Sequence, residues 1–120
     1  MKIQDVMTKN PITISSDATV GHTLDIFDRS QIKSIPVVNK DEIVGLITRN
    51  DIYTKSTNRQ EKISDIMSIN PLTVSPDDEL VKAIEIIKKT DLLEIVVARY
   101  NKIVGVLSIN DILEKVQTKK

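Results

Sequence analysis

The sequence predicts a mixed α/β (α+β) fold in which two β-α-β-β-α repeats pack about a pseudo-twofold axis into one compact module. Three observations predict it. The chain repeats itself at an offset of 60 residues, each copy alternates β-prone runs with helical spacing, and neither copy has enough helices to bury both faces of its own sheet. The repeats are expected at residues 1–60 and 61–120.

The internal repeat needs no gaps. Residues 5–55 align with residues 65–115 over 51 positions, of which 17 are identical and many others exchange one apolar residue for another. The mid-strand glycines Gly45 and Gly105 fall at equivalent positions, where glycine permits close approach of another backbone or of a ligand. A duplication of one structural unit accounts for this pattern.

Each copy predicts the same order of elements: strand, helix, strand, strand, helix. A β-prone run follows Asn-Pro, a stretch with helical spacing comes next, and two apolar runs joined by a polar turn predict a hairpin. We expect Ser75 to be the N-cap of one helix with Pro76 at its first position, and Asn50 and Asn110 to cap the last helix of each copy. The expected strands are residues 11–14, 35–38 and 43–48, and residues 71–74, 95–98 and 103–108.

Composition excludes several classes of protein. The chain has 17 basic and 17 acidic side chains, so its formal net charge is zero and no long-range field favours nucleic acid or an anionic membrane. Only 2% of the residues are aromatic, which excludes stacking platforms for single-stranded nucleic acid. No apolar run approaches the roughly 20 residues of a membrane span. Met1 leads into polar residues rather than a secretory signal, so we expect a cytoplasmic protein.

Catalytic and metal chemistry have few candidates in this sequence. There is no cysteine, which excludes thiolate metal sites and cysteine nucleophiles. The single histidine, His22, is expected early on a helix, so no nucleophile–base pair and no multi-histidine metal site is evident. Asp77 and Asp78 are explained more simply as a helix N-terminus than as a catalytic dyad. We therefore expect no catalytic residue, no metal and no catalytic cofactor.

Several short motifs occur along the chain, most of them twice and in the same order. They are Val6–Thr8 and Ile66–Ser68, the Pro-x-Thr-hydrophobic-Ser segments Pro11–Ser15 and Pro71–Ser75, Ile35–Val38, and above all Gly45–Ile52. Each motif is weak alone, but the doubled order at a constant offset is specific. Together the motifs resemble a tandem pair of CBS domains, the unit called a Bateman module, and the resemblance covers residues 1–118.

The resemblance implies regulation rather than catalysis. CBS pairs bind adenosine-containing ligands, usually AMP, ADP, ATP or S-adenosylmethionine, in clefts between the two copies, and they pass the signal to a neighbouring protein. For this chain the resemblance therefore implies an adenine nucleotide or S-adenosylmethionine as regulatory ligand, an unidentified effector protein and a homodimer. The alternative is a dimerising protein-interaction scaffold that binds no nucleotide.

The resemblance also implies which residues hold the ligand, because each cleft is built crosswise from both copies. Asp51 is expected to accept hydrogen bonds from the two ribose hydroxyls, and Thr48 is expected to face the phosphate beside a helix start. The other expected residues of this cleft, site A, are Lys33, Arg49, Leu72, Thr73 and Ile95. Site B is expected to combine Ser108 and Asp111 with Ile12, Thr13, Ser34, Ile35 and Pro36.

The same residues leave other interpretations open. Asp51 can be a first-turn residue that favours the helix dipole, and Arg49 can be a free surface arginine. The second copy has Ile109 in place of Arg49 and Glu94 in place of Ser34, so one cation is missing and a carboxylate would repel a phosphate. These differences favour a lightly charged ligand, or one occupied cleft, over two bound polyphosphates.

Overall fold

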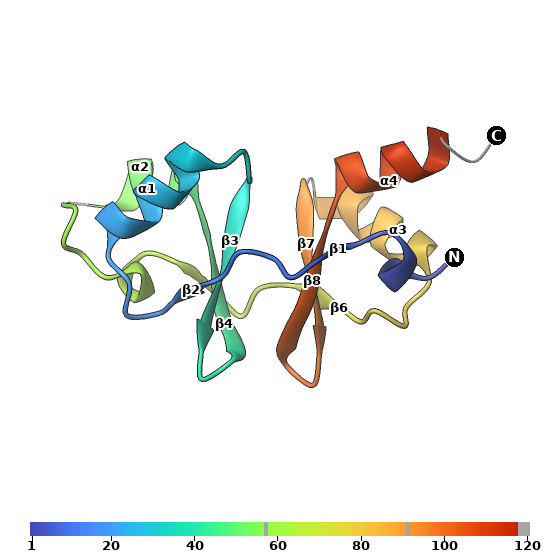
Figure 1. Ribbon diagram of the computed structural model, residues 1–120, viewed down its shortest axis with the longest axis horizontal. Coiled ribbons are helices and arrows are strands. Elements are labelled where there is room, and N and C mark those ends of the chain that lie inside the picture. The colour runs from blue at the N-terminus through green and yellow to red at the C-terminus, as the bar shows by residue number, and fades with distance from the viewer. Residues whose placement is uncertain (57, 91, 118–120) are drawn as a thin grey trace. The chain divides into compact units, whose positions relative to one another are not determined.

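The computed structural model describes residues 1–56, 58–90 and 92–117, and their secondary structure is mixed α+β, as the sequence predicts (Figure 1). The chain forms two compact units. One unit is Ile12–Pro71, and the other joins Met1–Pro11 to Leu72–Lys120. Each unit has its own hydrogen-bonded strands and its own apolar core.

The unit Ile12–Pro71 contains four strands, two helices and a 3₁₀ turn in its described residues. In chain order these are β2 (Ile14–Ser15), α1 (Val20–Arg29), β3 (Ser34–Asn39), β4 (Glu42–Thr48), α2 (Arg49–Lys55), η2 (Ile63–Asp65) and β5 (Ser68–Ile69). β2 lies parallel to β3, β3 and β4 form an antiparallel hairpin, and β5 lies antiparallel to β4. The predicted order of strand, helix, hairpin and helix is therefore confirmed for this copy.

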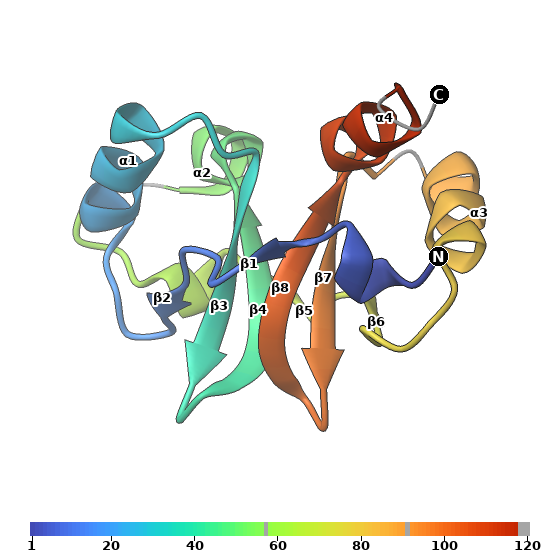
Figure 2. The same ribbon diagram turned by 45° about the vertical axis from the view of Figure 1, so that its right-hand side comes forward.

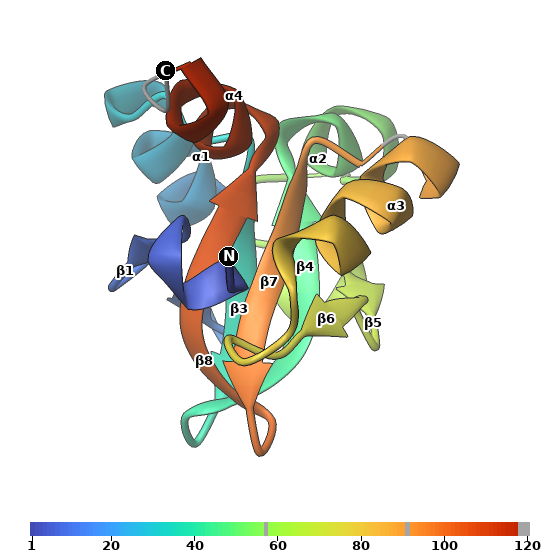
Figure 3. The same cartoon turned by 90° about the vertical axis from the view of Figure 1, so that its right-hand side faces the viewer.

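The second unit repeats this order in the residues that the structure describes. In chain order its elements are η1 (Ile3–Asp5), β1 (Thr8–Lys9), β6 (Thr73–Val74), α3 (Leu80–Thr90), β7 (Glu94–Arg99), β8 (Lys102–Ser108) and α4 (Ile109–Gln117). β6 is parallel to β7, and β7 and β8 form the antiparallel hairpin. β1 lies antiparallel to β8, beside it in Figure 2. The helices α3 and α4 lie beside the hairpin (Figure 3).

The cores consist almost entirely of aliphatic side chains. Ile35 and Val37 of β3 and Ile47 of β4 are fully buried, and they pack with the fully buried Phe27 of α1. The first core also contains Ile14, Val20, Ile52, Ile63 and Ile66. The second core consists of Ile3, Val74, Leu80, Ala83, Ile95, Val97, Leu107 and Ile112.

Each unit takes its last strand from the start of the other repeat. The segment η2–β5 opens the second repeat but belongs to the unit Ile12–Pro71, and η1–β1 opens the first repeat but belongs to the other unit. Ile3 and Ile63, which begin the two 3₁₀ turns, are both 0% exposed. The sequence prediction contains neither segment, because a two-residue strand is too short to show periodicity. Each compact unit therefore combines segments of both sequence repeats, and the repeat boundary between residues 60 and 61 stays a prediction.

The segments η1–β1 and η2–β5, which we call the exchanged segments, approach mid-strand glycines closely. A methyl group added at Gly45 would lie 2.8 Å from the carbonyl oxygen of Ser68 and would overlap the sulfur of Met67. One added at Gly105 would lie 2.7 Å from the carbonyl oxygen of Thr8. The close approach that the sequence predicts at these glycines is thus an approach of another backbone.

The predicted start of α3 at Ser75 and Pro76 is wrong, because the helix begins at Leu80. The intervening residues form a turn. The carboxylate of Asp78 accepts a hydrogen bond from the amide of Ser75 at 2.9 Å, and its main-chain carbonyl accepts one from the amide of Ile3 at 3.0 Å. These hydrogen bonds keep the residues before Leu80 in a turn that bonds to the N-terminal segment, so the helix does not extend back to Ser75.

The predicted caps at Asn50 and Asn110 are also wrong. Thr19 caps α1, Thr48 caps α2, and at the start of α4 the hydroxyl of Ser108 accepts a hydrogen bond from a first-turn amide. Thr48 and Ser108 are the last residues of β4 and β8. Because the final strand residue itself supplies the cap, each helix begins directly after its strand without a loop.

We predict that the segment η2–β5 stabilises the first unit through its buried side chains, of which Ile63 is fully buried. The variant Ile63→Ala should lower the free energy of unfolding by about 2–5 kcal/mol, because it leaves a cavity in the core. The variant Ile69→Ala, at a side chain that is 68% exposed in the same segment, should change it by less than about 0.5 kcal/mol. Urea unfolding of the full chain measures both, and equal losses would contradict the assignment.

We also predict an acid-dependent contribution from the turn before α3. The hydrogen bond from the Ser75 amide, and then the neighbouring Lys82 ammonium, lower the pKa of the Asp78 carboxyl below its ordinary value. A carboxyl with a lowered pKa stabilises the fold fully above its unfolded value of about 4, and loses that effect as pH falls through the folded value.

The measurement compares Asp78→Asn with the unaltered chain by urea unfolding between neutral and acid pH. The difference in unfolding free energy should be constant at neutral pH, should begin to shrink near pH 4, and should disappear only once the pH is below the lowered pKa of Asp78 in the folded protein. Asp17→Asn, which removes the same charge from a side chain that is 85% exposed, is the control. A difference that persists unchanged in acid would refute the role of the charge.

Candidate functional site

The motif Thr48–Asp51 joins β4 to α2 through two reciprocal hydrogen bonds. The Thr48 hydroxyl accepts from the Asp51 amide at 3.0 Å, and Oδ2 of Asp51 accepts from the Thr48 amide at 3.0 Å. This is a capping box, which satisfies two main-chain donors at the helix start. Oδ1 of Asp51 lies 3.4 Å from the Lys55 ammonium, and the Asp51 side chain keeps 15% of its surface exposed. The carboxylate is therefore fixed through Oδ2, while Oδ1 faces the Lys55 ammonium.

The second copy builds the same corner between β8 and α4. The Ser108 hydroxyl accepts from the Asp111 amide at 3.0 Å, and Oδ2 of Asp111 accepts from the Ser108 amide at 3.1 Å. A further donor comes from the N-terminal segment, because the Thr8 hydroxyl lies 3.3 Å and 3.4 Å from the two Asp111 oxygens. The sequence prediction did not include Thr8 in a site. The 60-residue repeat is the signal that could have found it, since Thr8 and Ser68 open equivalent strands.

Arg49 is directed toward α1. Its Nη1 donates to the Asp28 carboxylate at 3.0 Å, its Nη2 donates to the Phe27 carbonyl at 2.8 Å, and its guanidinium carbon lies 5.3 Å from the centre of the Phe27 ring. Hydrogen bonding to Tyr53, and then to Asp28, raises the pKa of the Arg49 guanidinium above its ordinary value. The alternative of a free surface arginine is wrong, and Arg49 would have to leave these partners to reach a phosphate.

The segment before β3 lies at the same end of its hairpin as the capping box. Ser34 is the strand partner of Thr48, and Lys33 precedes it with an exposed side chain. Ile35 and Pro36 are fully buried, and Ile35 belongs to the core of its own unit. Ser34 of the expected site B and Thr48 of the expected site A are thus neighbours across one hairpin.

The other expected residues are divided between the surface and the cores. Ile12 begins the unit Ile12–Pro71, and Leu72 follows that unit along the chain. Their side chains are 45% and 47% exposed. Thr73 is exposed and Thr13 half-buried, whereas Ile95 is 2% exposed and lies in the second core. Each expected site combines residues of both units, and those two combinations remain predictions.

The two hairpin ends differ in charge. In the second copy Glu94 takes the place of Ser34 and is the strand partner of Ser108. Leu93, which takes the place of Lys33, is 54% exposed. The first hairpin end therefore carries a cation beside its capping box, whereas the second carries a carboxylate.

The described residues provide neither a metal-binding cluster nor a membrane-spanning helix. They hold no group of three or more histidine, cysteine or acidic side chains placed to bind a metal ion. None of the described helices combines the length and the apolar composition that a membrane crossing requires.

Comparison with known proteins places the chain in a family. The CBS domain model matches it twice, at residues 3–57 and 63–118. The chain is 31% identical over 120 residues to the uncharacterized protein MJ1232 of Methanocaldococcus jannaschii, covering 99% of this chain and 40% of that protein. It is 29% identical over 116 residues to inosine-5'-monophosphate dehydrogenase of the same organism, covering 95% of this chain and 23% of the enzyme. The chain spans less than half the length of these relatives.

Solved structures give the same result for the fold. The CBS domain pair of protein MJ0100, in complex with 5'-methylthioadenosine and S-adenosyl-L-methionine, is 25% identical with a TM-score of 0.87, covering 100% of this chain and 98% of that one. CBSX2 in complex with AMP is 19% identical with a TM-score of 0.89, covering 99% and 98%. Together with the two matches of the family model, which cover most of the sequence, these likenesses show that the chain belongs to the CBS domain family and carries a tandem pair of its domains.

Proposed function

We propose that this CBS pair is a regulatory module that binds an adenosine-containing ligand, either an adenine nucleotide or S-adenosylmethionine, and signals to a separate effector protein. The observation that carries the proposal is the doubled hydroxyl–carboxylate corner, Thr48 with Asp51 and Ser108 with Asp111. The 25% identical MJ0100 pair, whose structure holds 5'-methylthioadenosine and S-adenosyl-L-methionine, supports this ligand class. We further propose that the module acts as a homodimer in the cytoplasm and has no catalytic activity of its own.

The geometry of the capping boxes suits the proposed role of the aspartates. A carboxylate has about four lone-pair sites, and the capping hydrogen bond to Asp51 uses one oxygen. The other oxygen lies 3.4 Å from the Lys55 ammonium and has lone pairs left to accept a ribose hydroxyl, and a hydrogen bond to a charged acceptor contributes about 1.5–3 kcal/mol. The adjacent helix start adds main-chain donors and a positive dipole for a phosphate or carboxylate of the ligand. Pre-positioning by the cap means that little side-chain entropy is lost on binding.

The charges at the two hairpin ends favour different ligands at the Thr48–Asp51 and Ser108–Asp111 motifs. Lys33 favours a phosphate near Thr48 and Asp51. Glu94 disfavours a polyphosphate near Ser108 and Asp111, and tolerates a neutral or cationic ligand such as S-adenosylmethionine. We therefore propose one nucleotide site, site A, and a site B that takes a lightly charged ligand or remains empty.

A second candidate function is a dimerising scaffold that binds no nucleotide. Glu94 favours it, because it places a second carboxylate beside Asp111 at one of the two corners. Val96, in place of Pro36, also removes one of the motifs that carry the resemblance.

We predict that an adenosine ligand will raise the unfolding temperature in a saturable way. A ligand that binds only the folded state adds about 2.7 kcal/mol of stability at 100 times its Kd. The test is a thermal-shift titration of the full chain, freed of carried-over ligand, with AMP, ADP, ATP, S-adenosylmethionine and NADH. Absence of any shift would refute these ligands and favour the scaffold.

The variants for this titration must separate capping from ligand binding. Asp51→Asn and Asp111→Asn keep an oxygen that can accept the capping hydrogen bond but remove the charge, whereas replacement by alanine also removes the cap. We expect the asparagine variant of the occupied site to weaken the ligand by about 10- to 150-fold, which corresponds to 1.5–3 kcal/mol, with little change in its own unfolding temperature. If both asparagine variants bind as well as the unaltered chain, the aspartates are caps only.

A further inference from the structure

The hydroxyl of Thr8 already bonds to one of the two candidate aspartates. Thr8 is the first residue of β1, and its hydroxyl oxygen lies 3.3 Å from Oδ2 and 3.4 Å from Oδ1 of Asp111. Oδ2 also accepts the capping hydrogen bond from the Ser108 amide at 3.1 Å. Because the hydroxyl is almost equally distant from the two carboxylate oxygens, it faces both of them together. A vicinal diol that donated one hydrogen bond to each oxygen would need the same place.

The other unit has the same strand pairing but no such contact. Thr8 and Ser68 open equivalent strands in the same register, and a mid-strand glycine admits each strand to a similar distance. Among the described residues no hydrogen bond joins Ser68 to Asp51, and Oδ1 of Asp51 lies 3.4 Å from the Lys55 ammonium instead. The contact of Thr8 with Asp111 is therefore a difference between the two copies, and strand pairing alone does not produce it.

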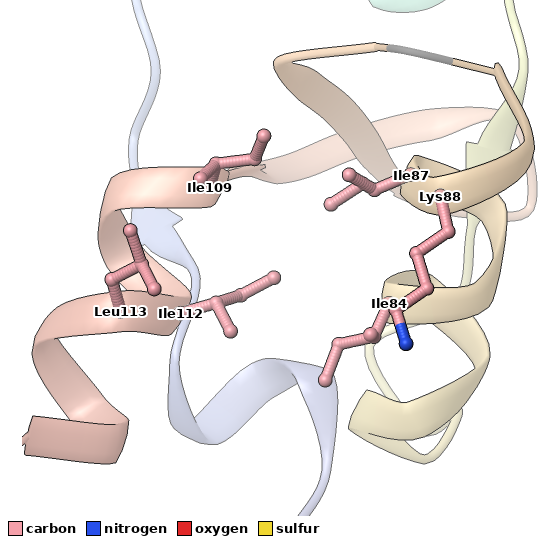
Figure 4. Close-up of a pocket in the computed structure, with 6 residues that line it drawn as sticks. All are labelled: Ile84, Ile87, Lys88, Ile109, Ile112 and Leu113. Atoms are coloured by element: carbon pink, nitrogen blue, oxygen red, sulfur yellow. The ribbon is translucent and has the colours of Figure 1, made fainter.

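Asp111 faces β1 and not the apolar side of its own helix. The side chains of Ile109, Ile112 and Leu113 line an apolar hollow between α4 and α3 (Figure 4). Because an α-helix has about 3.6 residues per turn, Asp111 projects from the opposite side of α4. Asp111 is half-buried and Thr8 is exposed. The Thr8 hydroxyl can therefore leave the carboxylate without exposing any core side chain.

We propose that Thr8 competes with the ribose hydroxyls of an adenosine ligand for Asp111, so that a ligand binds at this corner only by displacing Thr8. The inference rests on the proposed function, and it names the residue that makes the two corners unequal toward a diol. When an intramolecular donor holds the carboxylate, the binding-competent state is only a fraction of the population, and the apparent affinity falls by that fraction. Asp51 has no such donor from its neighbouring strand, so a diol binds there without this competition.

The competition also gives the ligand an effect on β1. Coupling between two binding events is reciprocal, so a diol that displaces Thr8 weakens the attachment of β1 by the same factor. The preceding turn η1 stays in place, because Ile3 is fully buried in the core of the unit. Shortly after β1 the chain enters the other compact unit at Ile12. A ligand at Asp111 therefore acts on the segment that connects one unit to the other.

The test titrates the ¹⁵N-labelled full chain, freed of carried-over ligand, with adenosine and with 2',3'-dideoxyadenosine, which lacks both ribose hydroxyls. NMR shifts of the Ser108 and Asp111 amides report binding at one corner, and those of the Thr48 and Asp51 amides report binding at the other. Thr8→Val removes the hydroxyl and keeps the shape of the side chain. It should strengthen adenosine at the Asp111 corner by about 2- to 10-fold, the effect of one hydrogen bond, and should leave dideoxyadenosine unchanged.

Two further variants serve as controls. Thr8→Ala should give the same gain as Thr8→Val, which excludes an effect of the valine side chain itself. Ser68→Ala removes the hydroxyl at the matched position of the other unit, and it should change binding at neither corner. Hydrogen exchange is the second readout: adenosine should accelerate exchange of the β1 amides in the unaltered chain, and should have no such effect in Thr8→Val.

Three results would overturn the inference. If adenosine binds the Asp111 corner of the unaltered chain and of Thr8→Val equally well, Thr8 does not compete, and the proposed function still stands. Equal gains for adenosine and dideoxyadenosine would show that Thr8 obstructs the corner sterically and does not compete for hydrogen bonds. If no variant binds adenosine at the Asp111 corner, there is no diol for Thr8 to exclude, and the proposed function then depends on the thermal-shift titration with the charged ligands.

Discussion

Each sheet in this chain is completed by a two-residue strand that comes from the start of the other repeat. Main-chain pairing of β1 with β8 and of β5 with β4 requires glycine at the mid-strand position, because a side chain there would displace the incoming backbone. The same segments bury Ile3 and Ile63, one in each core. The N-terminal segment also brings the Thr8 hydroxyl to Asp111. Sheet closure, core packing and one candidate binding group therefore depend on this exchange.

The helix corners show how one motif can serve two purposes. Thr48 and Asp51 satisfy the first amides of α2, and Ser108 and Asp111 do the same for α4. This capping role explains why both repeats have a hydroxyl residue followed three positions later by an aspartate. It also holds each carboxylate in one orientation at the end of a strand. Around this common frame the two copies differ in charge, because Lys33 precedes the strand partner of Thr48 in the first copy and Glu94 is the strand partner of Ser108 in the second.

The sequence predicts the elements that have a period and misses those that have none. The hairpins and the apolar faces of the helices follow from spacing, and the 60-residue repeat predicts two equivalent units. The two-residue strands leave no periodic signal. The sequence predicts Asn50 as the cap of α2 because asparagine is a good N-cap in isolation. In the structure Thr48 supplies that cap together with Asp51. The partners of Arg49 lie on a different helix, so they could not be predicted from the order of residues along the chain.

The exchange of opening segments has a mechanical consequence. A pull on Met1 would load the pairing of β1 with β8, and it would also load the ion pair between the Met1 ammonium and Glu79. These contacts all lie in the unit that contains the second repeat. Force applied at Met1 would therefore act first on contacts with residues of the second repeat, before it reaches the rest of the first repeat.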